Sequence, residues 1–485
     1  MPRPLTLLLV AVAVVGVTWA LLLPPGQAPD EPAHIGYAQV LAEDFRLPDT
    51  DPGRTFSREQ DLAQAYANVD QTAQVLETRP EWSKLGYDEW RQVDATLPKS
   101  GRGAGGHAGP FRGANPARAN PPFYYLWESI PYLVASGGDF FDRLYAMRIW
   151  SVVLLLIATS ATWLLIGELT GRRRSLQLAG AALVGLQPMA VFVSSSVNPD
   201  AALIAEFALT FWLGVRVLKR GLTLRDGVAL GAVAALGVLT KGTSYALVPA
   251  VGLALLIGAL RLDLRRRSTL VVAGLSGLAL AVPVLAWLGL ARALDRAAVN
   301  QVPGTVGGSS APGLPHVGLL DYLWQFYLPK LPFQGAVPAI DRLPVFDVWI
   351  KTGWGAFGWL EVRFPNAVYG VLAAVTVALL AGGLAALIRR RSRDDLAIVA
   401  FMAVAALSLL AGLHWIEYKS IQTDGVIFNQ GRYLLPLLPL LGVSAAASLS
   451  LLPERWRMRA CGAMLGGLFV LQVAGLAVMA GRFYA

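Results

Sequence analysis

The sequence contains little charge and a single cysteine. Only 15% of its 485 residues are charged and the mean hydropathy is +0.51, whereas a soluble protein usually carries about a quarter charged residues. The lone Cys461 excludes an intramolecular disulfide in any compartment. A Walker lysine loop, a GxGxxG turn after a predicted strand and an HExxH motif are also lacking. Nothing in the sequence therefore supports ATP-driven transport or zinc proteolysis.

Apolar runs of about 20 residues, the length that crosses a hydrocarbon core of about 30 Å, account for most of the missing charge. They predict an all-α polytopic membrane protein with about eleven transmembrane helices. The first run ends in Leu-Leu-Leu-Pro-Pro without a small-x-small cleavage site, so we expect an uncleaved span rather than a signal peptide. The predicted spans are 5–23, 147–167, 176–196, 201–218, 227–240, 243–260, 269–291, 366–388, 396–414, 432–452 and 460–480.

The net charge of +9 and the pI near 9.7 do not indicate a nucleic-acid partner, because the basic residues form short clusters between the apolar runs. Such clusters favour the cytoplasmic side of a bacterial cell membrane. All of the basic clusters lie on the cytoplasmic side if 227–240 and 243–260 each cross the membrane once, with an outer turn at Lys241. The N-terminus is then inside and the C-terminus outside. The clusters are Arg172–Arg174, Lys219/Arg220/Arg225, Arg261 with Arg265–Arg267, Arg389–Arg391 with Arg393, and Arg455/Arg457/Arg459.

The chain 1–485 reads as one integral-membrane domain with two long loops on the outer side, 24–145 and 292–365. Residues 24–145 hold 17 acidic and 11 basic residues, a net charge of −6, and include helix-like stretches at 57–78 and 81–95. The second loop opens with a Gly/Pro-rich segment, 303–315, which we expect to act as a lid. Long outer loops on a helical body predict that function resides at the outer face.

Three residues able to do chemistry follow the first span directly: Asp30, Glu31 and His34. Pro32 suits the first turn of a helix, and the apolar spacing over 32–45 predicts a helix lying along the membrane surface. Either carboxylate could cap that helix, where the dipole favours negative charge. The alternative is that both carboxylates merely cap the helix and that His34 is a surface histidine.

Four segments, and the order in which they follow one another along the chain, resemble the GT-C class of integral-membrane glycosyltransferases, which use polyprenyl-phosphate sugars. They are Asp30-Glu31, Asn120-Pro-Pro-Phe-Tyr-Tyr, the Thr240-Lys241 turn and Gln430-Gly-Arg-Tyr-Leu-Leu-Pro-Leu-Leu-Pro. A largely actinobacterial branch of predicted membrane proteins of unknown function is similar in further segments. These are Pro29-Asp-Glu-Pro-Ala-His, Tyr322-Leu-Trp-Gln-Phe-Tyr-Leu-Pro and Gly353-Trp-Gly-Ala-Phe-Gly-Trp-Leu-Glu. The resemblance covers most of the chain and implies a GT-C-like helical bundle, with short interfacial helices in its outer loops.

The resemblance also implies roles. An acidic residue in the first outer loop of GT-C enzymes acts as catalytic base, which points to Asp30 and secondarily to Glu31. Many members carry Asp-Asp or Asp-x-Asp, so the Asp-Glu pair leaves open which carboxylate is the base. A carboxylate within hydrogen-bond reach can take the proton of an attacking hydroxyl, and the leaving lipid phosphate needs cations or N–H donors.

Several residues are candidates for holding the substrate. Arg432 follows Gln430 at the outer boundary of a span, and a guanidinium binds phosphate bidentately; the alternative is an interfacial arginine that snorkels. Lys241, Lys330 and His34 are further phosphate candidates, with an interfacial anchor as the alternative for each lysine. Tyr433 lies beside Arg432 in the same segment and is included as a substrate-binding candidate. Aromatic residues that could stack on sugar, or form an interfacial belt, are Trp324, Phe326, Tyr327, Trp354 and Trp359.

Neither a metal nor a cofactor is expected. The four histidines, His34, His107, His316 and His414, show no ligand spacing, and the resemblance implies lipid-monophosphate donors that are often used without a metal. Asn198-Pro-Asp200 reads as an Asx-Pro turn between two span ends, with a sugar- or metal-binding role for Asp200 as the alternative.

The sequence therefore predicts an inverting glycosyltransferase that moves a sugar from polyprenyl phosphate to a cell-envelope glycan or lipid outside the cell membrane. A ligase that transfers a whole glycan from a lipid diphosphate is closely related to this prediction. A transporter or flippase of lipid-linked sugars is the first alternative, and Glu206 inside a predicted span is a point in its favour. A non-catalytic envelope assembly protein, with 24–145 as its binding module, is the second.

Overall fold

The computed structural model describes residues 1–48, 56–75, 78, 87–97, 104–106, 115–262, 267–296, 318–337, 340, 344–389, 393–424 and 429–485. The predicted lid 303–315, His107 and His316 lie outside these residues. The long helices are α1 (Arg3–Leu22), α7 (Phe140–Thr170), α10 (Asp200–Arg220), α11 (Leu224–Thr240), α12 (Leu247–Leu260), α13 (Arg267–Ala293), α16 (Asn366–Arg389), α17 (Arg393–Asp424), α18 (Leu438–Ser450) and α19 (Glu454–Phe483).

Shorter elements connect the long helices. The shorter α-helices are α2 (Glu31–Asp44), α3 (Arg58–Tyr66), α4 (Val69–Thr72), α5 (Tyr87–Thr96), α6 (Phe123–Val134), α8 (Arg174–Gly185), α9 (Pro188–Ser194), α14 (Leu319–Tyr327) and α15 (Thr352–Trp354). Tighter or wider turns form η3 (Pro116–Ala119), η4 (Gly242–Ala246), η5 (Val345–Lys351) and η6 (Gly431–Leu437). Two antiparallel strand pairs are β1 (Phe56–Ser57) with β2 (Ala104–Gly106), and β3 (Ala356–Phe357) with β4 (Val362–Arg363).

The prediction of an all-α polytopic membrane protein is confirmed. Within the described ranges, nine helical segments are long and apolar enough to cross a membrane, and a bent pair raises the number to ten. That pair replaces the predicted span 176–196: α8 and α9 meet at an angle of 57°, because Pro188 begins α9 and cannot continue a preceding helix. The remaining difference is α11, which has only 17 residues.

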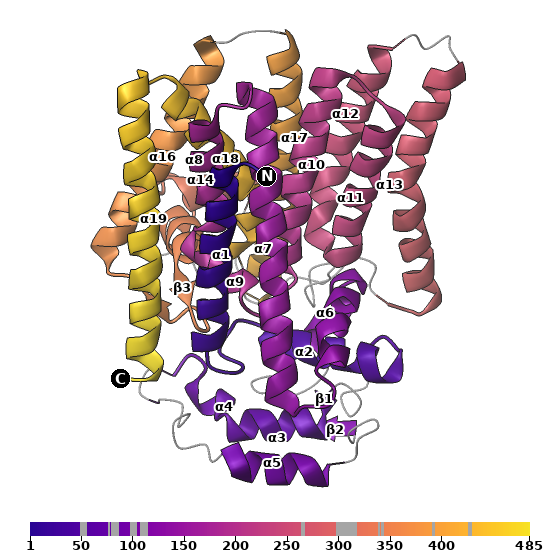
Figure 1. The fold of residues 1–485 in the computed structure, drawn as a ribbon, viewed down its shortest axis with the longest axis vertical. Coiled ribbons are helices and arrows are strands. Elements are labelled where there is room, and N and C mark those ends of the chain that lie inside the picture. Colours follow the sequence, from indigo (N-terminus) through magenta and orange to yellow (C-terminus); the bar gives the residue numbers. More distant parts are fainter. Residues whose placement is uncertain are drawn as a thin grey trace.

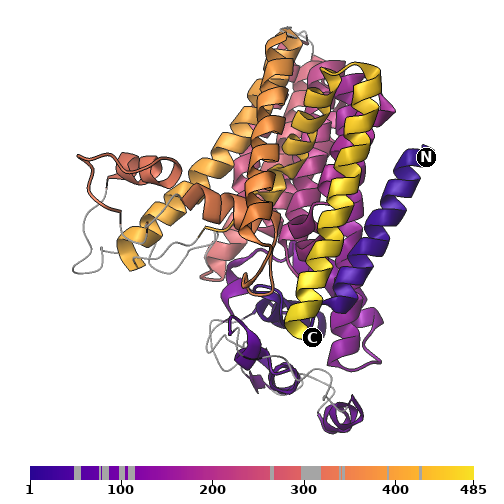
Figure 2. The ribbon, with the colours of Figure 1, turned by 90° about the vertical axis from the view of Figure 1, so that its left-hand side faces the viewer.

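The long helices run side by side as one bundle (Figure 1). Successive ones reverse direction except α7 and α10, which both end at the same rim because the bent pair α8–α9 lies between them. Helix α10 lies at its centre against α7, α11 and α12, and α8 lies between α7 and α18. Figure 2 shows α1 and α19 on one flank, with the helices of the first long loop below the bundle. Three clusters of buried apolar side chains fill the space between these helices, and α10 contributes residues to both of the larger ones.

Helices α8 and α18 cross where two glycines meet. A Cβ atom built on Gly180 would lie 2.4 Å from the carbonyl oxygen of Gly442, and one on Gly442 would lie 2.6 Å from the carbonyl oxygen of Gly180. Small residues at such a crossing let helix backbones approach closely in a membrane, where packing rather than water drives association.

The helix predicted over 32–45 exists as α2, and other elements of the chain enclose it. Nearly all of its residues are buried, on every side of the helix, because α6, η3 and β1 pack around it. Below it lie α3, α4 and α5, which correspond to the helix-like stretches 57–78 and 81–95 (Figure 1). Asn68, in the left-handed region at φ 52°, separates α3 from α4.

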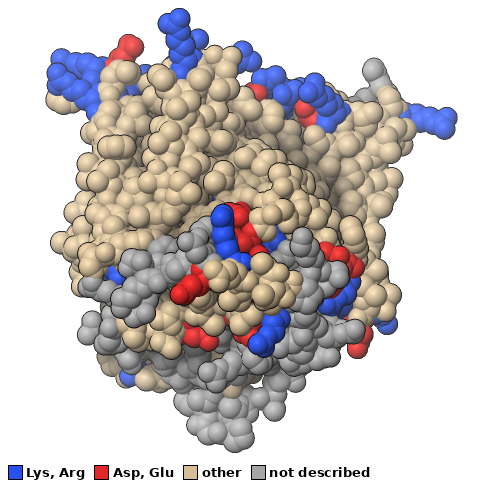
Figure 3. Space-filling model, turned by 60° about the horizontal axis from the view of Figure 1, so that its bottom comes forward, with Lys and Arg blue, Asp and Glu red and all other residues tan. Residues whose placement is uncertain are grey.

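Charge is concentrated at the ends of the bundle. Lys and Arg side chains form a row along the upper rim in Figure 3, whereas the flank above the loop layer is almost free of charge. Described members of the basic clusters, among them Arg172, Arg220, Arg261, Arg389 and Arg455, stand at helix ends on this rim. The clusters therefore share one end of the bundle, as their spacing in the sequence predicts.

The α8–α18 crossing yields a stability prediction. Gly442→Ala should lower the melting temperature of the detergent-purified protein, because the added methyl meets backbone atoms that cannot yield; overpacking of this kind costs about 1–3 kcal/mol. Gly466→Ala in α19 is the matched control, since no atom lies within 4 Å of its added Cβ. Equal melting temperatures for the two variants would show that the crossing is loosely packed.

Candidate functional site

Four segments far apart in the sequence bring charged side chains together at the end of the bundle opposite the basic rim. Asp30 follows α1, Asp200 begins α10, Lys241 follows α11, and Arg432 lies in η6 before α18. We call these four residues the charge cluster. Asn198 helps to position one of them, because its side-chain oxygen accepts a hydrogen bond of 2.9 Å from the Asp200 N–H, which confirms the predicted Asx turn.

Asp30 and Arg432 form a direct ion pair in which Nη2 of Arg432 donates to Oδ2 of Asp30. Asp30 occupies the N-cap position of α2, but its side chain makes no capping hydrogen bond there. Its backbone is in the left-handed region at φ 63°, which places the carboxylate beside η6. The side chain of Arg432 is only 4% exposed, whereas that of Asp30 is 38% exposed.

The Arg432 side chain has donors to spare. Its Nε and Nη1 groups are buried and have no hydrogen-bond partner in the described part of the chain. A buried N–H without an acceptor is unfavourable by about 1–3 kcal/mol. A guanidinium presented in this way suits an oxyanion, which can accept two parallel hydrogen bonds from it.

Lys241 and Asp200 form the second pair of the charge cluster, with 2.6 Å between Nζ and Oδ1. The ring of Tyr433 lies next to both cations: Nζ of Lys241 is 5.2 Å and Cζ of Arg432 is 5.3 Å from its centre. At these distances the face of an aromatic ring attracts a cation. Both cations therefore lie within cation–π distance of the same ring.

Glu31 has a different environment from Asp30. It is fully buried and paired bidentately with Arg148 of α7, at 2.8 Å from Nε and 2.6 Å from Nη2. The N–H groups of Gly26 and Val197 donate to the same carboxylate. Arg148 also donates to the carbonyl of Leu23, which follows α1. Every contact of Glu31 thus joins chain segments, and none leaves it open to a ligand.

His34 lies one turn along α2, facing the motif that begins at Asn120. Its Nδ1 is 2.9 Å from the Tyr125 hydroxyl, which also accepts a hydrogen bond from Nδ2 of Asn120. Because Tyr125 accepts from Asn120, its own proton can go to Nδ1 of His34, leaving the proton of the neutral ring on Nε2. The ring of Tyr37 stacks on Tyr125 with centres 3.6 Å apart.

Burial and neighbouring charges set the protonation states of His34 and Asp30. Burial lowers the pKa of His34 to about 3, against the opposing effect of Asp30, so the ring is neutral near pH 7. For Asp30, burial acts to raise the pKa, but Arg432, His34 and Lys241 outweigh it, and the pKa lies below the usual 3.8. Asp30 is therefore an ionised carboxylate in the resting site.

The segment that contains Gly353 packs against Gly431, the residue before Arg432. A Cβ atom on Gly431 would lie 2.3 Å from the backbone nitrogen of Gly353. The two segments of the chain therefore cross with their backbones in direct contact. The Gly431 N–H donates to the Thr352 hydroxyl at 2.6 Å, and Gln187 donates to the Gly353 carbonyl. Next to the crossing, Oε1 of Gln430 is buried with no partner among the described residues.

The remaining predicted residues lie apart from the charge cluster. Within the described ranges, no hydrogen bond, ion pair or ring contact joins Trp324 or Lys330 to it; Trp324 donates to the Pro329 carbonyl, and Lys330 is exposed. Trp354 is buried and donates to Thr376 of α16. Trp359 donates to the Gly26 carbonyl, beside the turn that leads to Asp30.

Tyr327 and Phe326 surround the buried His414 of α17. The Nε2 of His414 is 2.6 Å from the Tyr327 hydroxyl, and its Nδ1 is 2.8 Å from the Tyr322 hydroxyl. The Phe326 ring packs edge-on against the imidazole. These side chains fasten α14 to α17. In the described part of the chain, no group of three His, Cys, Asp or Glu side chains could hold a metal ion.

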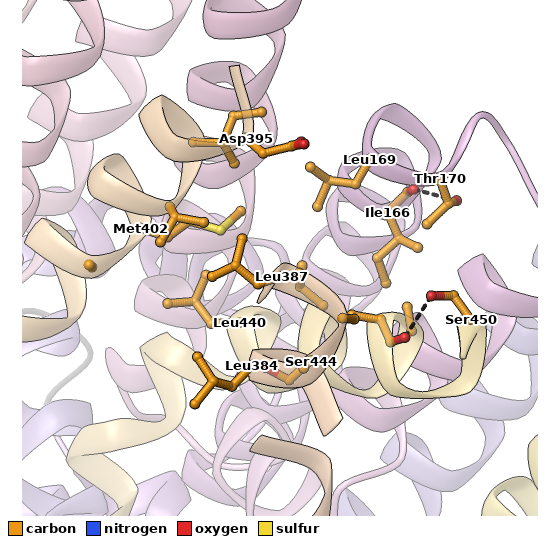
Figure 4. Close-up of a pocket in the computed structure, with 18 of the residues that line it drawn as sticks. Ile166, Leu169, Thr170, Leu384, Leu387, Asp395, Met402, Leu440, Ser444 and Ser450 are labelled. Atoms are coloured by element: carbon orange, nitrogen blue, oxygen red, sulfur yellow. Dashed lines mark hydrogen bonds between the residues drawn. The ribbon is translucent and has the colours of Figure 1, made fainter. Parts of the chain in front are cut away.

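An apolar cavity of about 340 Å³ lies at the other end of the bundle, between α7, α16, α17 and α18. Leu169, Leu384, Leu387, Met402 and Leu440 point into it (Figure 4). Among its polar lining residues, Thr170 donates to Ile166 and Ser450 to Ala447, whereas Ser444 and Asp395 add a hydroxyl and a carboxylate to a mostly apolar lining. Such a lining suits hydrocarbon rather than a polar substrate.

The structure gives importance to two residues to which the sequence reasoning assigned no role, Arg148 and Tyr125. Arg148 opens an apolar run, and an arginine at such a position needs a partner; this signal predicts a buried acidic partner but does not say which one. Tyr125 lies in the Asn120 motif, where only the structure shows its contact with His34.

A further buried acid, Glu128, lies in α6. Oε1 of Glu128 accepts a hydrogen bond of 2.6 Å from Ser151, and its Oε2 is buried without a partner among the described residues. Burial raises the pKa of Glu128 to about 8, despite the opposing hydrogen bonds from Ser151 and Tyr124. Glu128 is therefore mostly protonated near pH 7.

The Glu31–Arg148 pair yields a stability prediction. Glu31→Gln leaves a buried guanidinium without its counter-charge, and we expect a loss of about 3–5 kcal/mol, seen as a lower melting temperature and less folded protein. Glu168→Gln is the control, because its partner Arg220 is 45% exposed and such pairs contribute about 0–1 kcal/mol. A Glu31→Gln protein as stable as wild type would contradict the structural role.

Glu128 yields a prediction about pH. The folded state binds this proton more tightly than the unfolded state, so stability is complete below the ordinary value of 4.5 and is lost as the pH rises towards about 8. Glu128→Gln should therefore raise the melting temperature relative to wild type more at pH 8 than at pH 5. The exposed Glu454→Gln should show no such trend, and a pH-independent difference for Glu128→Gln would contradict the prediction.

Comparisons with known proteins place the chain in a family. Among solved structures it is similar to ArnT from Cupriavidus metallidurans bound to undecaprenyl phosphate, with 16% identity and a TM-score of 0.45, covering 98% of this chain and 63% of ArnT. It is also similar to the archaeal oligosaccharyltransferase AglB from Archaeoglobus fulgidus, in complex with an inhibitory peptide and a dolichol-phosphate, with 13% identity and a TM-score of 0.47. That match covers 99% of this chain and 56% of AglB.

The chain thus spans less than two thirds of the length of each of these two proteins. No curated protein matches it. A family model does match, over residues 13–441, which is most of the chain and confirms the predicted resemblance to a branch of membrane proteins of unknown function. The chain belongs to the family described as "Predicted membrane protein (DUF2142)".

Proposed function

We propose that the protein is a membrane-embedded glycosyltransferase that takes a sugar from a polyprenyl phosphate. The observation that carries this proposal is the Asp30–Arg432 pair: a partly exposed carboxylate lies beside a buried guanidinium with two N–H groups free of partners in the described chain. A transferase of this kind needs a base for the acceptor and a cation for the phosphate. The sequence resemblance to GT-C enzymes points to Asp30, and secondarily to Glu31, as the base, and Arg432 lies in one of the segments that carry this resemblance.

The proposed reaction is a displacement at the anomeric carbon. The acceptor hydroxyl oxygen forms a bond to that carbon while its proton passes to the Asp30 carboxylate. The bond between the anomeric carbon and the phosphate oxygen breaks, and the oxygen keeps the electron pair. The lipid phosphate leaves with its new negative charge against Arg432, and attack from the opposite side inverts the anomeric configuration.

Other residues would support these two. Lys241 carries a second positive charge next to Arg432, on the same Tyr433 ring. The neutral His34, with its proton on Nε2, could donate a hydrogen bond to phosphate or sugar. Gln430 offers a buried carbonyl oxygen without a partner in the described residues. Glu31 takes no part in this proposal, and we propose that no metal is needed.

The site would face the outside of a bacterial cell membrane. The basic clusters share one end of the bundle, and the positive-inside rule makes that end cytoplasmic. The charge cluster lies at the other end, where the long loops gather (Figure 1). The N-terminus is then cytoplasmic, and the acceptor is a cell-envelope glycan or lipid.

One observation favours transport of lipid-linked sugars as a second candidate. Glu206 is buried in α10, accepts a hydrogen bond of 2.7 Å from Thr240, and has a second carboxylate oxygen without a partner among the described residues. Buried acids and broken helices such as the α8–α9 pair are typical of transporters. A transporter would depend on Glu206 and not on the charge of Asp30.

Sugar transfer in isolated membranes tests the proposal. Membranes containing equal amounts of wild type, Asp30→Asn or Glu206→Gln would receive labelled polyprenyl-phosphate sugars, with and without a metal chelator. We expect Asp30→Asn to lower the rate at least about a hundredfold, the usual contribution of a general base. Glu206→Gln should retain transfer, and the chelator should have no effect.

The other outcomes are equally informative. Transfer that survives Asp30→Asn would remove Asp30 as the base. Absence of transfer from every donor, together with lipid-linked sugar flipping that Glu206→Gln abolishes, would establish the transporter. Absence of both activities would favour an assembly protein.

A further inference from the structure

Asp30 is paired with the same arginine that we propose as the phosphate holder. Nη2 of Arg432 donates one of its two N–H bonds to Oδ2 of Asp30, so a phosphate that binds Nη2 together with a second nitrogen of the guanidinium comes directly against this carboxylate. In this pair the carboxylate is also a poor base, because the neighbouring cations stabilise its charged form and weaken its attraction for a proton. In the resting site, the proposed base Asp30 is therefore paired with Arg432, the residue proposed to bind the phosphate.

We propose that the lipid phosphate displaces Asp30 from Arg432, so that donor binding itself releases the carboxylate to act as base. This inference rests on the proposed function and adds an order to it. The donor binds first, and only then can Asp30 take the proton of an acceptor hydroxyl.

The exposures of the two partners determine which one moves. Arg432 is 4% exposed and Asp30 is 38% exposed, so the carboxylate can turn into water while the guanidinium cannot. Arg432 is also held from behind, because Gly431 crosses Gly353 in direct backbone contact. An incoming phosphate thus finds Arg432 fixed in place, whereas Asp30, which competes for it, can move.

Charge balance explains why displacement is needed. The charge cluster has two carboxylates and two cations, and the buried His34 is neutral, so the resting cluster has no net charge. An added phosphate would lie against Asp30 with like charge and a shared donor, which is unfavourable at close range. Removal of Asp30 from Arg432 leaves one positive charge for the incoming phosphate.

Unused donors on Arg432 supply the driving force. Its buried Nε and Nη1 have no acceptor in the described part of the chain. A phosphate can accept from one of these groups and from Nη2 together, whereas Asp30 uses Nη2 alone. The exchange therefore replaces one hydrogen bond by at least two, and charge-assisted bidentate pairs of this kind are the strong ones.

The test is binding of sugar-free undecaprenyl phosphate to the full chain in lipid nanodiscs. Asp30→Asn removes the competitor, and we expect its Kd to fall about tenfold below that of wild type, equivalent to about 1.4 kcal/mol. The control is Asp44→Asn at the other end of α2, because the charge change is the same and the side chain is 34% exposed. Its Kd should stay within about twofold of wild type.

Two additions make the test decisive. Asp30→Gly serves as a second variant, because glycine readily adopts the backbone φ of 63°, and it should tighten binding as Asp30→Asn does. Repeating the titrations at about 0.5 M salt, where charges are screened beyond a few ångströms, distinguishes direct competition from long-range repulsion. The gain should persist there if Asp30 competes for the same N–H groups.

The outcomes separate this inference from the proposed function. Wild type that binds lipid phosphate, with both Asp30 variants no tighter than wild type, would overturn the displacement and leave the transferase intact. A gain that vanishes at high salt would overturn it as well. Wild type that does not bind the lipid phosphate at all would contradict the proposed function itself.

Discussion

The buried Glu31–Arg148 pair determines the geometry on which the site depends. Arg148 comes from α7, deep in the bundle, and binds both the carbonyls after α1 and the carboxylate that begins α2. A charge pair in this position cannot shift without leaving one partner unsatisfied, so the corner between α1 and α2 is fixed. Asp30 is the residue before Glu31, and the corner turns its side chain away from Arg148 and towards Arg432. The structural role of one carboxylate leaves its neighbour available for chemistry.

The charge cluster combines fixed cations with one adaptable anion. Lys241 and Arg432 flank the ring of Tyr433, and both are largely buried. Asp200 is buried and tied to Lys241. Asp30 alone of the four is substantially open to water. This division suits the proposed reaction, in which the phosphate site must exist before the substrate arrives, while the proposed base changes its protonation state during the cycle.

Much of this arrangement could be predicted from the sequence, and the remainder depends on contacts between distant segments. The apolar runs predicted the helical bundle, and the basic clusters predicted its common end, because both signals are local. The choice between Asp30 and Glu31 was not possible, since it depends on Arg148, which lies 117 residues from Glu31. The enclosure of α2 was not predicted, because the elements that cover it, α6 and η3, come from a distant part of the chain. The stacking role of Trp324 stays a prediction.

The crossing of Gly431 and Gly353 has a consequence for the thermodynamics of binding. A loop that carries a ligand-binding arginine usually loses conformational entropy when the ligand orders it, and this loss weakens affinity. Here the backbone before Arg432 is already immobilised against a second segment. Association at this site should consequently show a small entropic penalty from the protein, and a side chain at Gly431 would reintroduce that penalty by separating the two segments.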